Sequence, residues 1–165
     1  MRTKTILGLI LIFFQLAPNS LNAQSIPHTY LTSIDGQEVS SDEVFTEGQP
    51  ILLIFWATWC DHTCKGLTTI QDDYLVDWVE EFNVKIVAVS VDDMKTTNRA
   101  VTIANTKAWD FDIFLDVNGD FKRAMGVNNA PYVFLLNSKG EIIWQQNAYL
   151  EGDEDRIEEL LEELK

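Results

Sequence analysis

Cys60 and Cys64 are the only two cysteines of the chain, and three residues separate them. They follow a run, residues 51–56, in which every residue is apolar, and they precede a segment with helical periodicity. A cysteine at the junction of a strand and a helix is placed for thiol chemistry, because the positive end of the helix dipole stabilises a thiolate there. The spacing therefore predicts that Cys60 is the more reactive of the two sulfurs.

Three kinds of chemistry suit such a pair: a structural disulfide, a metal site and a redox-active dithiol. A disulfide between residues this close closes a very small loop and adds little stability. Zinc needs four protein ligands, or three and a water, and the only histidines are His28 and His62. Copper(I) accepts fewer and softer ligands, so two thiolates and one histidine would suffice for it. The dithiol fits best, with Cys60 as the attacking thiolate and Cys64 as the thiol that resolves the mixed disulfide.

The spacing of the pair raises a geometric question. Side chains four apart on a regular helix have Cβ atoms about 5–6 Å apart, whereas a disulfide needs about 3.8 Å. We therefore expect either a loosened first turn or an extra residue in the loop before the helix. In the second case Thr63 is the expected helix cap.

The segments around the pair predict a βαβ unit. Residues 51–56 are typical of a strand that helices cover on both faces. The apolar residues after Cys64 recur at steps of three and four, which predicts a helix that ends near Asn83. Residues 84–91 then predict a second strand parallel to the first, with Asp92 and Asp93 at its carboxyl end.

The remaining elements follow from turn signals and periodicity. The Asp35-Gly36 turn predicts an early hairpin. Residues 116–120 are rich in oxygen ligands, but the glycine falls one position early for a calcium loop and no glutamate closes it, so we predict a turn with a helix cap. Further predicted elements are a helix at 98–108, strands at 111–115, 133–136 and 141–144, and an amphipathic helix at 153–165 with a solvated acidic face.

Residues 1–23 are predicted to be a secretory signal peptide, cleaved after Ala23. Its apolar core, residues 6–16, is shorter than the roughly 20 residues that span a bilayer, so we expect no stable membrane anchor. Residues 24–165 are predicted to form one domain, which is expected to be a monomer. The segment removed holds two of the 12 basic residues and none of the 26 acidic ones, which leaves a net charge of −16. Such a surface argues against nucleic acid as a partner. Export to the periplasm or the extracellular space places the cysteines where disulfides persist.

Several motifs together resemble the TlpA/ResA-like branch of the thioredoxin-fold thiol–disulfide oxidoreductases. They are the run at residues 55–60, the hairpin at 33–36, Ala130-Pro131 before a strand, and the turn at 137–140. The resemblance implies an α/β, thioredoxin-like fold in which helices flank a central mixed sheet, with an N-terminal β-hairpin extension. It also implies that Pro131 is cis and faces the cysteines, and that Ala130 offers backbone groups to an extended substrate peptide. Trp59 would shield the pair.

The chain departs from that family at two points. Three residues separate its cysteines instead of two, and the positions where relatives carry a buried proton-accepting acid are Ile54 and Leu67. No proton acceptor is therefore obvious below the pair, and His62 is the expected substitute. Sco-type copper chaperones share the three-residue spacing, but they use a histidine from a later loop, and no histidine follows His62. The threonine and proline that flank a peroxiredoxin's reactive cysteine are missing.

From the resemblance we expect an exported thiol–disulfide oxidoreductase, in the reducing direction, that acts on protein disulfides through Cys60 and Cys64. It would need no cofactor or bound metal, and it would depend on an electron donor that the sequence does not identify. The alternative is a Sco-like copper(I)-binding assembly factor that uses the same two cysteines.

Overall fold

The structure, a computed structural model, describes residues 25–150 and 152–165; the predicted signal peptide lies outside this range. A seven-stranded sheet has the order β2-β1-β5-β4-β3-β6-β7. It is mixed, because β3 is parallel to β4 and antiparallel to β6. The strands are β1 (Tyr30–Ser33), β2 (Glu38–Ser40), β3 (Ile51–Trp56), β4 (Lys85–Ser90), β5 (Asp112–Leu115), β6 (Tyr132–Leu136) and β7 (Ile142–Gln146).

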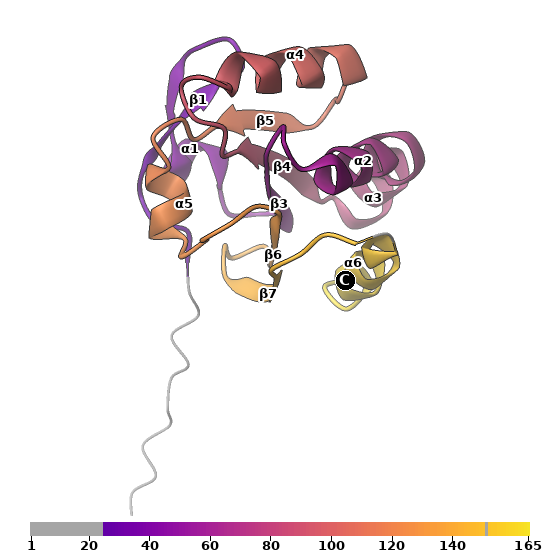
Figure 1. Ribbon diagram of the computed structural model, residues 1–165. Coiled ribbons are helices and arrows are strands. Elements are labelled where there is room, and N and C mark those ends of the chain that lie inside the picture. Colours follow the sequence, from indigo (N-terminus) through magenta and orange to yellow (C-terminus); the bar gives the residue numbers. More distant parts are fainter. Residues whose placement is uncertain (1–24, 151) are drawn as a thin grey trace, which may run out of the picture.

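Helices cover both faces of this sheet. The figure shows α1 and α5 on one side, and α2, α3 and α6 on the other (Figure 1). Each side has its own apolar core, and Ala100 and Ala104 of α4 belong to the larger one, with α2, α3 and α6. The helices are α1 (Ser41–Val44), α2 (Asp61–Thr69), the π-helical turn η1 (Ile70–Tyr74), α3 (Leu75–Phe82), α4 (Thr97–Lys107), α5 (Asp120–Ala124) and α6 (Asp153–Glu162).

The central strand β3 is apolar at every position because each of its faces is buried. Successive side chains of a strand point to opposite faces. Leu52, Ile54 and Trp56 therefore enter the larger core, while the alternate residues enter the smaller one. All six are fully buried, which confirms the prediction from the sequence.

The helix after β3 begins at the junction predicted for Cys60, but it differs from the prediction in its middle. It begins at Asp61, directly after Cys60, and contains one π-helical turn, η1. The buried residues Ile70 and Trp78 are eight apart, which exceeds two turns of a regular α-helix. The wider π turn takes up the excess and returns Trp78 to the core side.

Two further findings concern helices. The segment before β3 contains the short helix α1, which was not predicted; the Ser40 hydroxyl caps its first turn and accepts from the Asp42 N–H at 3.2 Å. The prediction that the acidic residues of α6 face solvent is wrong for one of them, because Glu154 is buried. Its carboxylate accepts a hydrogen bond from the Tyr149 hydroxyl at 2.8 Å. The Tyr149 ring lies so close to Gly66 that a Cβ at that position would overlap it.

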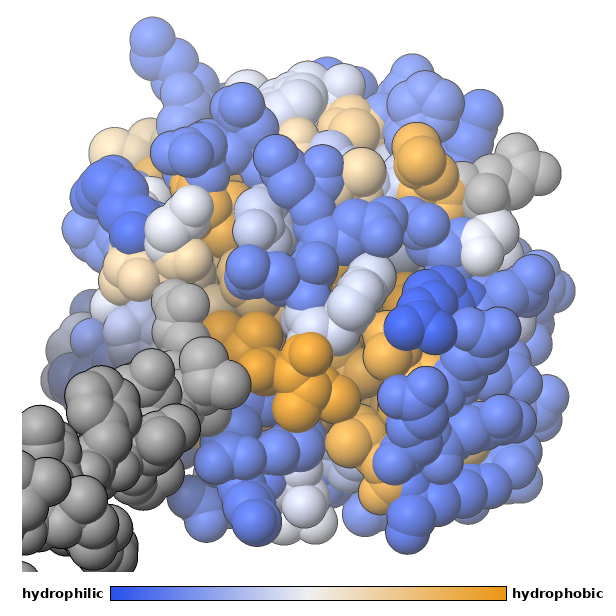
Figure 2. Space-filling model, turned by 90° about the horizontal axis from the view of Figure 1, so that it is seen from below, coloured by the Kyte–Doolittle hydropathy of each residue, from blue (hydrophilic) through white to orange (hydrophobic). Residues whose placement is uncertain are grey.

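The strand β7 forms one edge of the sheet and exposes Ile143. Seen from below, hydrophobic residues gather at the centre of the molecule's face and hydrophilic residues border them (Figure 2). Among residues 25–150 and 152–165, no helix has the length and hydropathy needed to span a bilayer.

Candidate active site

Cys60 lies where the turn after β3 meets α2. It is the N-cap residue of α2, with an extended backbone (φ −104°, ψ 90°), and its N–H donates to the Ala57 carbonyl at 3.0 Å. The Cys64 N–H donates to the Cys60 carbonyl at 3.2 Å, so the first helical turn is closed. The extra residue between the cysteines therefore lies in the helix. Of the two expected arrangements, neither an extra residue in the preceding loop nor a loosened first turn is found.

Thr63 has a different role from the predicted one. It lies inside the first turn of α2 and is fully buried, so it does not cap the helix. Its hydroxyl donates to the Cys60 sulfur at 3.0 Å. A hydrogen bond donated to sulfur stabilises the thiolate form over the thiol. Thr63 thus supports the reactivity that the sequence predicts for Cys60.

Cys64 is in a less favourable setting for a thiolate. Its Sγ lies 3.8 Å from the Ala57 carbonyl, to which the thiol donates. Burial raises the pKa of the Cys64 thiol, and the nearby Cys60 and Asp61 raise it further. Both cysteines are free and partly exposed. The two sulfurs thus differ in the way that an attacking and a resolving thiol should differ.

Asp92 is the residue that the sequence analysis missed. It follows β4, is only 1% exposed, and its charge also raises the pKa of Cys64. The Thr58 N–H and hydroxyl both donate to its carboxylate, at 2.9 and 2.7 Å. A buried acid therefore acts on Cys64, although Ile54 and Leu67 occupy the positions where relatives carry such an acid. The signal was its place at the end of a strand parallel to the one that precedes Cys60.

The three predicted substrate-binding residues follow β3 in the chain or precede its neighbour β6, and Ala130 is buried. Trp59, next to Cys60, is 62% exposed, which rules out a role as a core aromatic. The Ala130–Pro131 peptide bond is cis, as the resemblance implied. Tyr132 pairs with Phe55, so Pro131 lies beside the carboxyl end of β3, from which the chain turns towards Cys60.

The histidines do not complete a metal site in the described part of the chain. His62 is exposed on the first turn of α2, and His28 bonds Asp42 at 2.7 Å. In residues 25–150 and 152–165 no three His, Cys, Asp or Glu side chains are grouped so that they could hold a metal ion.

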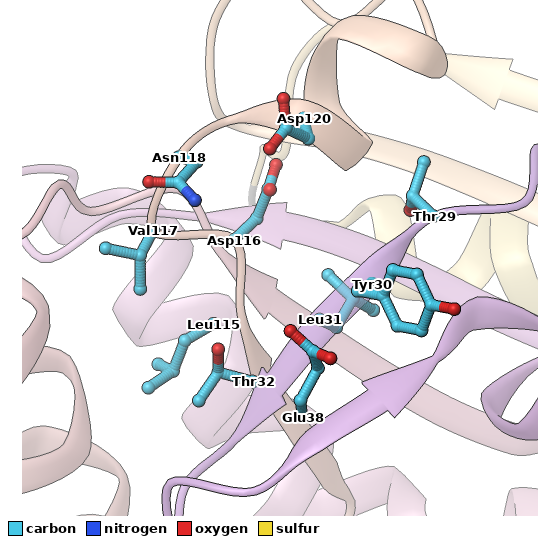
Figure 3. A pocket seen from close by; sticks show the side chains of 10 residues that line it. All are labelled: Thr29, Tyr30, Leu31, Thr32, Glu38, Leu115, Asp116, Val117, Asn118 and Asp120. Atoms are coloured by element: carbon cyan, nitrogen blue, oxygen red, sulfur yellow. The ribbon is translucent and has the colours of Figure 1, made fainter.

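The oxygen-rich turn at residues 116–120 is a helix cap, as predicted. Asp116 is buried, and its carboxylate accepts from the N–H groups of Phe121 and Lys122 at 3.2 and 2.7 Å. Burial raises the pKa of this carboxyl. The figure shows Asp116 and Asp120 at this turn, on one side of a cavity of about 350 Å³ (Figure 3).

The comparison with known proteins agrees with this geometry. Residues 23–145 match the AhpC/TSA family. The chain is 30% identical over 139 residues to sporulation thiol-disulfide oxidoreductase A of Bacillus subtilis, which covers 83% of this chain and 81% of that protein. It is 29% identical over 125 residues to the thiol:disulfide interchange protein DsbE of Haemophilus influenzae, covering 75% of this chain and 65% of that protein.

A solved structure shows the same fold. The solution structure of a thioredoxin-like protein from Porphyromonas gingivalis superposes with a TM-score of 0.74 at 34% identity, over 84% of this chain and 90% of that one. The fold is therefore thioredoxin-like, as the resemblance implied. The chain belongs to the AhpC/TSA family of thioredoxin-like proteins and is a thiol–disulfide oxidoreductase.

Proposed function

We propose that this protein is an exported enzyme that reduces protein disulfides through the Cys60–Cys64 dithiol. The observation that carries the proposal is the difference between the two sulfurs. Cys60 begins a helix and accepts a hydrogen bond from Thr63, whereas burial and neighbouring negative charge hold Cys64 as a thiol.

The reaction follows from this difference. The Cys60 thiolate attacks one sulfur of a substrate disulfide, forms a mixed disulfide and releases the other substrate sulfur as a thiolate. Cys64 then gives up its proton to the released substrate thiolate and attacks the Cys60 sulfur. The Cys60–Cys64 disulfide forms, and the second substrate thiolate leaves. Two electrons pass from the dithiol to the substrate, and a dithiol donor must return two electrons to the enzyme before the next cycle.

The surroundings of Cys60 suit an extended protein segment as substrate. Trp59, which precedes Cys60 in the chain, offers an exposed aromatic surface. Ala130 is 6% exposed, and none of the loop hydrogen bonds between backbone groups in the described residues uses it. Its N–H and C=O are the groups that would pair with a peptide next to Pro131.

Export follows from the predicted signal peptide, and it agrees with a structural relative that is described as a secreted disulfide oxidoreductase. The periplasm or the extracellular space is then the site of action. The substrate is a protein disulfide, and the donor is a second protein dithiol.

The test is the reduction potential of the pair, measured in dithiothreitol and glutathione buffers, together with insulin reduction. We expect a potential in the range of thioredoxin-like reductants, above about −300 mV, and turnover that is lost in Cys60→Ser. A lower potential with no turnover would indicate a structural disulfide. Stoichiometric copper(I) binding that requires Cys60, again without turnover, would indicate the copper-binding alternative. The Cys64→Ser variant should retain its substrate as a mixed disulfide, and Cys60→Ser is the matched control.

A further inference from the structure

Asp92 is a carboxylate that the fold buries without a cation. Of the residues that the structure describes, none forms an ion pair with it. Its Oδ2 accepts from the Thr58 N–H and the Ser90 hydroxyl, both at 2.9 Å, and its Oδ1 accepts from the Thr58 hydroxyl at 2.7 Å. Burying a charge is costly unless hydrogen bonds compensate it, so these donors must hold the carboxylate in place.

Two of these three bonds come from one residue of the turn that carries Cys60. Thr58 follows Ala57 in this turn, which the hydrogen bond from the Cys60 N–H to the Ala57 carbonyl closes at 3.0 Å. The same carbonyl accepts from the Cys64 thiol. A carboxylate that fixes Thr58 therefore also fixes the carbonyl to which both cysteines bond.

Asp92 has a second connection to the pair, which is electrostatic. The charged groups that act on Cys64 are Cys60 and Asp61 from its own helix end, Asp92 from the end of β4, and Arg99 from α4. The first three disfavour a thiolate at Cys64, and Arg99 favours it. Of these charged groups, Asp92 is the one whose side chain is buried and fixed by hydrogen bonds.

We propose that Asp92 is a positioning residue of the thiol site, whose carboxylate both fixes the turn 57–60 and places a negative charge near Cys64. It thereby keeps Cys64 a thiol until a mixed disulfide forms on Cys60. This inference rests on the proposed function, in which Cys60 attacks and Cys64 resolves. Among its hydrogen bonds in the described residues none goes to sulfur, so Asp92 acts through Thr58 and through its charge.

The electrostatic half is tested by the pH dependence of Cys64 alkylation by iodoacetamide in a Cys60→Ser background. Asp92→Asn should shift the midpoint to lower pH, because the charge that opposes the thiolate is gone. Thr58→Val should leave the midpoint in place, because it removes the hydroxyl and keeps the charge. Asp93→Asn is the matched control, since it removes the neighbouring, exposed carboxylate; an equal shift in this control would overturn the electrostatic role.

The positioning half is tested by hydrogen exchange at the Thr58 and Cys60 amides in the otherwise native protein. Both Asp92→Asn and Thr58→Val should speed this exchange, while Thr58→Ser, which retains the hydroxyl, should not. Unchanged exchange in both of the first two variants would overturn the positioning role. If Asp92→Asn does not fold, Asp92→Ser, a smaller side chain that still forms hydrogen bonds, replaces it in both experiments.

These measurements use no disulfide substrate, so they separate the inference from the proposed function. A protein that reduces no disulfide could still show the alkylation shift, and the proposed function would then fail alone. An active reductase with an unchanged Cys64 midpoint and unchanged exchange would leave the proposed function standing and remove the role of Asp92.

Discussion

Two buried aspartates at the carboxyl ends of neighbouring strands serve different purposes. Asp92 follows β4 and Asp116 follows β5, and these strands are parallel neighbours. The two side chains are 1% and 3% exposed. Asp116 accepts from backbone N–H groups five and six residues ahead, whereas Asp92 accepts from Thr58, 34 residues away.

The difference shows that burial and place in the fold do not decide what a carboxylate does. Asp116 satisfies the first N–H groups of α5, a local task of helix capping. Asp92 connects two strand ends, and one of these leads directly to Cys60. The partners of the two carboxylates, and not their exposure, separate a structural residue from one at the active site.

The comparison predicts that alanine costs more stability at position 92 than at position 116. Asp92→Ala leaves three donors of Thr58 and Ser90 without their acceptor in a buried place, which should cost about 3 kcal/mol or more. Asp116→Ala removes a cap and should cost about 1 kcal/mol. Urea unfolding of both variants, with the slope checked for constancy, measures the two losses. Equal losses would mean that the hydrogen bonds between Asp92 and Thr58 stabilise the protein no more than the cap at Asp116 does.

Much of the fold could be predicted because its signals are local. The apolar run 51–56, the Asp35-Gly36 turn and the stop at Asn83 each depend on neighbouring residues, and the structure has β3, the first hairpin and a left-handed cap at Asn83. The π turn was not predictable from a repeat of three and four, since it shows only when the buried side of the helix is known.

The site was less predictable than the fold because its contacts are long-range or depend on one rotamer. The bond between Thr58 and Asp92 joins residues 34 positions apart, and the sequence indicates only that both follow neighbouring parallel strands. The role of Thr63 depends on where α2 begins, and a shift of its start changes the residue from a cap to a donor for sulfur. The positions of Trp59 and Pro131 came from the family resemblance alone.

The second prediction concerns pH. Burial raises the pKa of the Asp116 carboxyl above its value of about 4 in the unfolded chain. The folded protein therefore holds this proton more tightly than the unfolded chain. The stability that Asp116 contributes is largest at low pH and falls as the pH rises from about 4 through the folded pKa. Urea unfolding across this window should show the wild type losing stability relative to Asp116→Asn.

The stability that Asp93 contributes should change with pH in the opposite direction, so Asp93 serves as the control. Hydrogen bonds from the N–H of Lys95 and the hydroxyl of Thr96 lower the pKa of its exposed carboxyl. The wild type should therefore lose stability relative to Asp93→Asn as the pH falls through that pKa. Curves of the same sign for the two variants would contradict the assignment of Asp116 as a carboxyl whose burial opposes its charge.

The third prediction extends the comparison to two buried threonines. The hydroxyl of Thr58 serves a carboxylate, and that of Thr63 serves the Cys60 sulfur. In a Cys64→Ser background, Thr63→Val should slow alkylation of Cys60 at neutral pH by about fivefold, since one hydrogen bond of about 1 kcal/mol to the thiolate is lost. Thr63→Ser should react at close to the original rate. If Cys60 were alkylated as fast in Thr63→Val as in the parent, or slowed equally in Thr63→Ser, the hydroxyl of Thr63 would have no role in the reactivity of Cys60.

The smallest expected effect concerns Asp120, which pairs with Arg123 at 2.6 Å while both side chains are well exposed. Exposed pairs of this kind contribute less than about 1 kcal/mol, so Asp120→Asn should change the free energy of unfolding little.

The negative charge of Asp120 nevertheless raises the pKa of Asp116. Asp120→Asn should therefore lower the titration midpoint of the Asp116 carboxyl, followed by carbon NMR. Asp112→Asn removes a charge that pairs with Lys85 and should leave this midpoint unchanged. An unchanged midpoint in Asp120→Asn would mean that burial and the hydrogen bonds from Phe121 and Lys122 set the titration of Asp116 without its exposed neighbour.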